Sequence, residues 1–203
     1  MSEIDRALSE LAFIQDRFAA STRFRGLAPL AVAATGVIAL LVAATESIAA
    51  TRGPLGSDFV ATWVATAIVA AGLLGVEALG RARRLHAGMA EMMLASTLRL
   101  LLPFGAAGAV ITFVIMRAAP DVAWILPGLW QMLVALLGFS AVGTLPKAIM
   151  WPAGWYFLSG TVTLLLGAYS GTPDPWMMGA PFGVGQLLVA FVLQREGAID
   201  GGE

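Results

Sequence analysis

Apolar residues fill six stretches of the chain almost without interruption, and polar residues gather in the short segments between them. A helix needs about 20 apolar residues to cross a bilayer, because each residue adds only about 1.5 Å along the axis. Each of the six stretches meets this length. None alternates apolar and polar residues, as a transmembrane β-strand would. We therefore predict an all-α, polytopic membrane protein built as a six-transmembrane-helix bundle.

The bundle is predicted to occupy residues 26–195. Its helices are expected at 27–49, 58–79, 96–117, 122–143, 149–170 and 174–195. Gly and Pro in the segments between these ranges, such as Gly53-Pro54 and Ala119-Pro120, break helices and support the borders. Residues 196–203 are predicted to form a disordered cytoplasmic tail.

The first 25 residues have a different pattern. Apolar residues recur there at helical spacing, with charged residues between them, which predicts an amphipathic cytoplasmic helix. Such a helix lies on the inner leaflet, docks to a protein partner, or packs across the end of the bundle. The residues predicted to make cytoplasmic contacts are Leu8, Leu11 and Phe18 of this helix and Arg81 and Arg84 of the second loop.

The composition argues against several classes of function and points directly to none. Hydrophobic residues make up 59% of the chain and charged residues 12%, about half the usual charged fraction of roughly 25%. Cysteine is absent and His86 is the single histidine, which argues against thiolate or multi-histidine metal sites and predicts no metal or cofactor. The net charge of −1 gives no attraction to nucleic acid. No common catalytic motif is present, so no catalytic residue and no enzyme activity are predicted.

Positive charges indicate the orientation. Ten of the twelve Lys and Arg residues fall on the side of the bundle that holds both termini, and only Arg52 and Arg117 fall on the other. By the positive-inside rule, both termini are expected in the cytoplasm. The chain is rich in Ala and Gly and prefers Arg to Lys, which is typical of high-GC bacterial genomes. We therefore expect a multi-pass protein of a bacterial inner membrane.

Two glutamines are the long polar side chains in the middle of predicted spans. Gln131 and Gln186 both fall near the centre of the bilayer, and each follows a proline, Pro127 or Pro181, by four or five residues. An unpaired amide in hydrocarbon is costly, so both side chains are expected to face the interior of the bundle. Two hypotheses follow: hydrogen bonds between helices, or a ligand site or pore lined by these four residues.

The second half of the chain contains a weak internal repeat. The segment from Pro103 to Ala135 resembles the segment from Pro152 to Ala190 in the order of its prolines, glycines, tryptophans and glutamine. Together with the first two spans, this suggests three helical-hairpin repeats that enter the membrane from the same side.

Two classes of function remain. The first is a non-catalytic regulatory, sensory or accessory membrane subunit that contacts cytoplasmic partners. The alternative is a small transporter, channel or substrate-binding membrane subunit for an uncharged or lipophilic small molecule. The predicted partners are the lipid bilayer and a cytoplasmic or membrane protein, with a homo-oligomer as a further alternative. A cavity joining the two glutamines would favour the second class, and a filled interior would favour the first.

Overall fold

The computed structural model describes residues 28–50, 57–85, 90–143 and 145–200. Six α-helices and three short 3-10 helices make up nearly all of this part, which contains no β-strand. The elements are α2 Pro29–Ala50, α3 Ser57–Leu85, α4 Ala90–Ala118, η1 Pro120–Ile125, α5 Leu126–Ser140, η2 Ala141–Gly143, η3 Lys147–Ile149, α6 Met150–Ser170 and α7 Trp176–Asp200. The predicted all-α fold with six long apolar helices is confirmed.

All six helical segments are long and apolar enough to cross a membrane. Their apolar spans have 21 to 24 residues, which corresponds to about 31–36 Å at about 1.5 Å per residue. A helix makes most of its backbone hydrogen bonds within the segment, which suits it to hydrocarbon. These are the helices of a multi-pass membrane protein.

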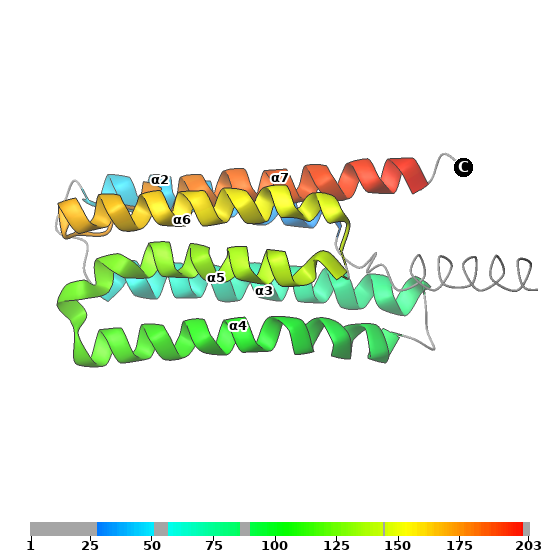
Figure 1. Cartoon of the computed structure of the whole chain (residues 1–203), viewed down its shortest axis with the longest axis horizontal. Coiled ribbons are helices and arrows are strands. Elements are labelled where there is room, and N and C mark those ends of the chain that lie inside the picture. The colour runs from blue at the N-terminus through cyan, green and yellow to red at the C-terminus, as the bar shows by residue number, and fades with distance from the viewer. Residues whose placement is uncertain (1–27, 51–56, 86–89, 144, 201–203) are drawn as a thin grey trace, which may run out of the picture.

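The helices lie side by side with roughly parallel axes (Figure 1). Contacts run around the bundle in the order α2, α7, α6, α5, α4, α3 and back to α2. The most extensive contacts join α2 to α7 and α5 to α6. By contrast, no residue in the apolar window of α4 is buried against the described part of the chain. The bundle is therefore tight on one side and loose around α3 and α4.

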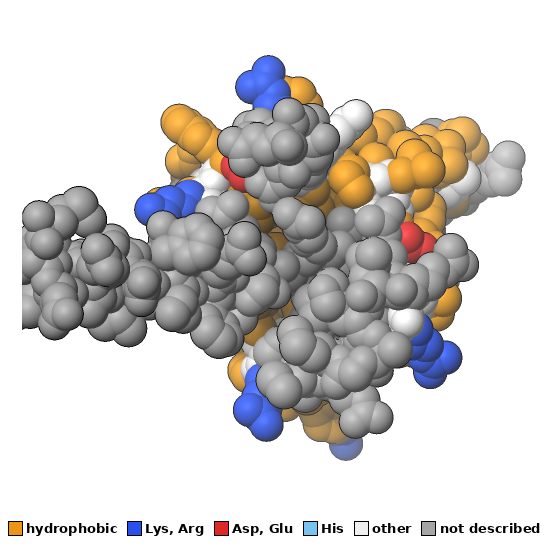
Figure 2. Space-filling view, turned by 90° about the vertical axis from the view of Figure 1, so that its right-hand side faces the viewer, with side chains coloured by type: hydrophobic (Ala, Val, Ile, Leu, Met, Phe, Trp, Pro, Cys, Tyr) orange, Lys and Arg blue, Asp and Glu red, His pale blue; other side chains and the backbone are white. Residues whose placement is uncertain are grey.

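The two ends of the bundle differ in charge. We call them the Asp121 end, where α4 turns into η1 and α6 into α7 (left in Figure 1), and the Arg83 end. Four exposed basic residues lie at the Arg83 end: Arg83, Arg99, Lys147 and Arg195. Figure 2 looks at this end and shows basic side chains around its rim.

The Asp121 end is closed by tight turns. Helix α6 is capped by Gly171, whose φ of 67° is the left-handed conformation that glycine adopts without strain. Just beyond, the Asp174 carboxylate accepts a hydrogen bond of 2.7 Å from the backbone N–H of Trp176. This bond satisfies one of the free N–H groups at the start of α7.

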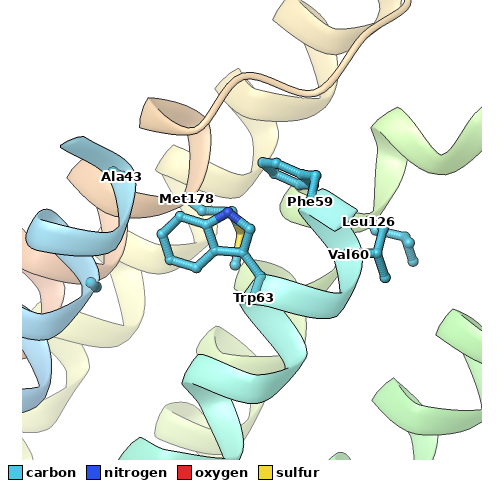
Figure 3. Packing of buried hydrophobic residues seen from close by; sticks show 7 residues of the cluster. Ala43, Phe59, Val60, Trp63, Leu126 and Met178 are labelled. Carbon is cyan, nitrogen blue, oxygen red and sulfur yellow. The ribbon is translucent and has the colours of Figure 1, made fainter. Parts of the chain in front are cut away.

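An apolar cluster fills the bundle near the Asp121 end. Its buried members are Ala39, Ala43, Phe59, Val60, Trp63, Leu126 and Met178. They come from α2, α3, α5 and α7, and Trp63 reaches from α3 toward Ala43 and Met178 (Figure 3). The cluster therefore ties α3 to the tightly packed side of the bundle.

The ends of several predicted segments differ from the structure, and α3 continues to Leu85, six residues past its predicted end. Helix α7 continues to Asp200, so the tail predicted from residue 196 begins no earlier than residue 201. Gln194, Arg195 and Glu196 are good helix formers at the end of the span Trp176–Glu196, and the helix continues past them to Asp200. Helix α4 begins at Ala90, six residues before the predicted start. The amphipathic helix predicted for residues 1–25 lies outside the described residues, and the hairpin repeats stay a prediction.

A candidate site at the centre of the bundle

Both central glutamines lie in the middle of apolar spans. Gln186 is the central residue of the span Trp176–Glu196, and Gln131 is one residue past the centre of Pro120–Ser140. Gln131 is 0% exposed, and Gln186 is partly buried. The two glutamines pack against different helices. The Cβ of Gln131 lies beside Gly160 of α6, and the Cβ of Gln186 lies beside Gly36 of α2.

The Gln131 amide nitrogen lies close to three acceptors on three helices. Nε2 is 2.8 Å from the Met177 carbonyl of α7, 3.3 Å from the Thr163 hydroxyl of α6 and 3.2 Å from the Pro127 carbonyl of its own helix. Two of these acceptors are carbonyl oxygens, so only the nitrogen of the amide fits this position. The shortest of the three bonds therefore connects the middle of α5 to the backbone of α7.

A proline in α7 explains why the Met177 carbonyl is free to accept. In an α-helix this carbonyl would bond to the N–H four residues later, and that residue is Pro181, which has none. A buried carbonyl left without a donor costs about 1–3 kcal/mol. Gln131 supplies the missing donor from a neighbouring helix.

Helix α6 supplies two further donors to the next turn of α7. The Trp155 indole N–H donates to the Pro181 carbonyl at 2.9 Å, and the Tyr156 hydroxyl lies 3.5 Å from the Phe182 carbonyl. The Gln186 side chain lies near the Tyr156 hydroxyl. We call Gln131, Trp155, Tyr156, Thr163 and Gln186 the central polar belt.

One face of α6 brings the two glutamines into the same region. Tyr156, Gly160 and Thr163 follow one another at helical spacing and are all buried. Gln186 contacts this face at Tyr156, while Gln131 contacts it one to two turns further along, at Gly160 and Thr163. The side chains of Gln131 in α5 and Gln186 in α7 thus both face the same side of α6, at different positions along its axis.

Glycines leave little room beside the belt. A Cβ on Gly160 would lie 3.1 Å from the Cβ of Gln131, and a Cβ on Gly128 would lie 2.5 Å from Leu164. A Cβ on Gly36 would lie 3.0 Å from the Cβ of Gln186. Glycine at these positions lets the backbones approach closely, as is common between transmembrane helices.

Pro127 differs from Pro181 in its position within the helix. It lies in the first turn of α5, where a helix has no use for the missing N–H group, so it starts the helix and does not kink it. Its side chain is buried and its carbonyl accepts from Gln131. Of the two prolines, Pro181 is the one that removes a bond from the interior of a helix.

Three buried polar atoms lack a hydrogen-bond partner in the described part of the chain. They are the Gln131 Oε1, the Trp63 Nε1 and the Glu46 Oε2, the last on a carboxylate whose other oxygen accepts from Thr62 at 3.3 Å. Each such atom has lost its bonds to water without replacement, at a cost of about 1–3 kcal/mol. Gln131 therefore uses its donor fully and its acceptor not at all.

The side chains of the five residues predicted to make cytoplasmic contacts are not described by the structure. Leu8, Leu11 and Phe18 lie outside the described residues. Arg81 and Arg84 belong to the last turns of α3, but their side chains are also outside the description. No three His, Asp or Glu side chains in the described ranges gather closely enough to hold a metal ion.

Sequence reasoning missed the partners of Gln131. Thr163, Trp155 and Tyr156 resemble ordinary residues of an apolar helix, and the Met177 acceptor is a backbone group. One signal was present: a proline inside a helix leaves the carbonyl four residues earlier without a donor, so Pro181 pointed to Met177.

The fold and the belt define a six-helix integral membrane protein with a polar, hydrogen-bonded centre. Comparison with known proteins finds no matching family model, no similar curated protein and no similar solved structure.

Proposed function

We propose that this protein is a non-catalytic regulatory, sensory or accessory subunit of a bacterial inner membrane, with both termini in the cytoplasm. In this role it acts through contacts with other proteins and does not move a solute. The observation that carries the proposal is the state of Gln131. This amide has no exposed surface, and its donor is bound to α6 and α7.

The packing around Gln131 supports the same proposal. A pore or solute site at this depth would need room beside the amide, whereas Gly128 and Gly160 bring α5 and α6 into close contact there. The belt therefore acts as an interhelical connection in this conformation.

The loose side of the bundle is the surface available to a partner within the membrane. Helix α4 presents large apolar side chains such as Leu102, 62% exposed, and Phe113, 69% exposed. The exposed basic residues of the Arg83 end, on the proposed cytoplasmic side, offer a second contact region. Lipid alone would also cover α4, so the experiment must separate lipid from protein.

Site-specific photo-cross-linking in native membranes makes this separation. We would place a photoreactive phenylalanine at Leu102 or Phe113 of α4, and as a matched control at Leu165 of α6, which is 58% exposed. We expect one protein adduct of defined mass, identified by mass spectrometry, from the α4 positions and none from Leu165. Equal labelling at all three positions, or no adduct at either α4 position, would contradict the proposal.

The alternative is binding or passage of an uncharged or lipophilic small molecule. The three unpartnered polar atoms of Gln131, Trp63 and Glu46 favour it, because a ligand could supply the missing partners. Flux through liposomes containing the purified protein tests it with glycerol and urea as probes. Flux above that of empty liposomes, abolished by Gln131→Leu, would replace the accessory role.

A further inference from the structure

Helix α7 joins two pairs of helices that are each held by glycine contacts. In the first pair, Gly179 and Gly183 of α7 pack directly on α2, and a Cβ at Gly179 would lie 3.1 Å from the Ala39 carbonyl oxygen. In the second pair, Gly128 of α5 packs on Gly160 of α6. Close contacts of this kind tolerate little sliding, so each pair should move as one body.

One glycine also lies between the two pairs, Gly185 of α7, which packs on the ring of Tyr156 of α6 and not on a backbone. The polar contacts between the pairs are hydrogen bonds. Gln131, Trp155 and Tyr156 donate from α5 and α6 to three carbonyls of α7, those of Met177, Pro181 and Phe182. We call this set of three side chains and three carbonyls the α7 seam. The seam lies at the turn where Pro181 interrupts the hydrogen-bond ladder of α7, which is where a helix bends most readily.

Gln131 is imperfectly satisfied in this arrangement. Its nitrogen serves Met177, but its Oε1 is buried without a partner. If the bond between Gln131 and Met177 breaks, the Met177 carbonyl loses its donor. If the same movement brings the Gln131 Oε1 to a donor or to water, the penalty for that unpaired oxygen is removed. Two penalties of similar size, each about 1–3 kcal/mol, therefore oppose each other at Gln131, and such a balance is what a conformational switch requires.

We propose that the α7 seam is a two-state switch. In the described state, Gln131 holds the Met177 carbonyl and the two helix pairs are closed on each other. In the second state, the α2–α7 pair is displaced from the α5–α6 pair at the Asp121 end, and Gln131 releases the carbonyl. This inference goes beyond the accessory role and does not depend on it, because it concerns the isolated bundle.

The chain has no cysteine, so two cysteines can be engineered into the full-length protein and each labelled with one spin label. A pair at Ala49 of α2 and Tyr169 of α6 spans the seam at the Asp121 end, and both positions are exposed. A pair at Ala49 and Trp176 stays within the α2–α7 body and serves as the internal control. Double electron–electron resonance on protein in nanodiscs measures both distance distributions.

The decisive variants are Gln131→Met and its combination with Pro181→Ala. Methionine keeps the volume but leaves the Met177 carbonyl without a donor, so we expect the longer-distance population to rise about five- to tenfold. Alanine at 181 restores an N–H for that carbonyl within α7, so the double variant should return to the closed distribution. Thr35→Val removes a buried hydroxyl that bonds only locally, to the Val32 carbonyl, and should change nothing.

A second route keeps the test informative if Gln131→Met does not fold. Trp155→Phe removes the donor to the Pro181 carbonyl and keeps an aromatic ring, so it should also raise the longer distance. Here Pro181→Ala should give no rescue, because it supplies no donor to that carbonyl. A single unchanged distance in every variant, a shift that Pro181→Ala leaves in place in Gln131→Met, or an equal shift in Thr35→Val would overturn the switch.

Discussion

Replacing Gly179 by alanine tests whether the contact between α2 and α7 holds the bundle together. A Cβ at this position would overlap the Cβ of Ala43 and would lie 3.1 Å from the carbonyl oxygen of Ala39. Ala43 is 0% exposed and has no rotatable side chain, so the strain can be relieved only by moving the helices apart. Overpacking of this kind costs about 1–3 kcal/mol, and we expect the free energy of unfolding to fall by that amount.

Gly154→Ala is the matched control, because it makes the same chemical change on α6. A Cβ there meets no atom within 4 Å, so only the helix propensity changes. Alanine is favoured over glycine by up to about 1 kcal/mol, and we expect the control to be neutral or stabilising. The same substitution should therefore destabilise the protein at Gly179 and be neutral or stabilising at Gly154.

A size exchange checks the mechanism of the effect. Ala43→Gly removes the methyl that the new side chain would meet, so Gly179→Ala and Ala43→Gly together should cost less than the sum of the two single changes. We expect a coupling free energy of about 1 kcal/mol or more between them. The assay is reversible unfolding in mixed micelles by titration with a denaturing detergent, followed by circular dichroism. Equal effects of Gly179→Ala and Gly154→Ala, or strict additivity with Ala43→Gly, would refute the packing argument.

Four further predictions use similar measurements. Leucine in place of either central glutamine should change the unfolding free energy by about 1 kcal/mol or less, because the lost bonds at Gln131 are offset by removal of its unpaired oxygen; a loss above about 3 kcal/mol would contradict this. Trp63→Phe, which removes an unpaired N–H but keeps a buried ring, should also be nearly neutral in the detergent titration. Reporter fusions at Ala119 should report the periplasm and fusions at His86 the cytoplasm, and the reverse pattern would invert the proposed topology. Deletion of residues 2–22 should leave a folded bundle in detergent; failure to insert would show that this segment belongs to the core.

Hydropathy was sufficient to predict the number and kind of helices, and physical chemistry explains why. In hydrocarbon, an apolar stretch of about 20 residues has no better way to satisfy its backbone than to form a helix. The ends were less predictable, since α7 continues past Glu196, the last residue of its apolar span, to Asp200. Hydropathy carries no information on this point, because a helix can end in water or in the interface.

Hydropathy does not predict which helices pack together. Lipid is as apolar as leucine, so apolar pattern alone does not tell a residue that faces lipid from one that faces a helix. Glycine gives part of the missing information. Gly179 and Gly183 lie four residues apart, a spacing that is common where transmembrane helices pack closely, and the structure gives their partner as α2. Gly72, Gly105 and Gly154 have no neighbour within 4 Å, so glycine by itself does not mark an interface.

At the central site, the sequence allowed a more specific prediction than the inward orientation of the glutamines. The two glutamines were expected to face inward because an amide cannot remain unpaired in hydrocarbon, and Gln131 is fully enclosed. The same reasoning applies to a backbone carbonyl that a proline leaves free, and there it specifies an atom. Pro181 required a donor for the Met177 carbonyl from outside α7, and few side chains at mid-membrane could provide one. In an apolar bundle, a proline inside one helix and a long amide at the same depth of another are therefore best considered as one pair.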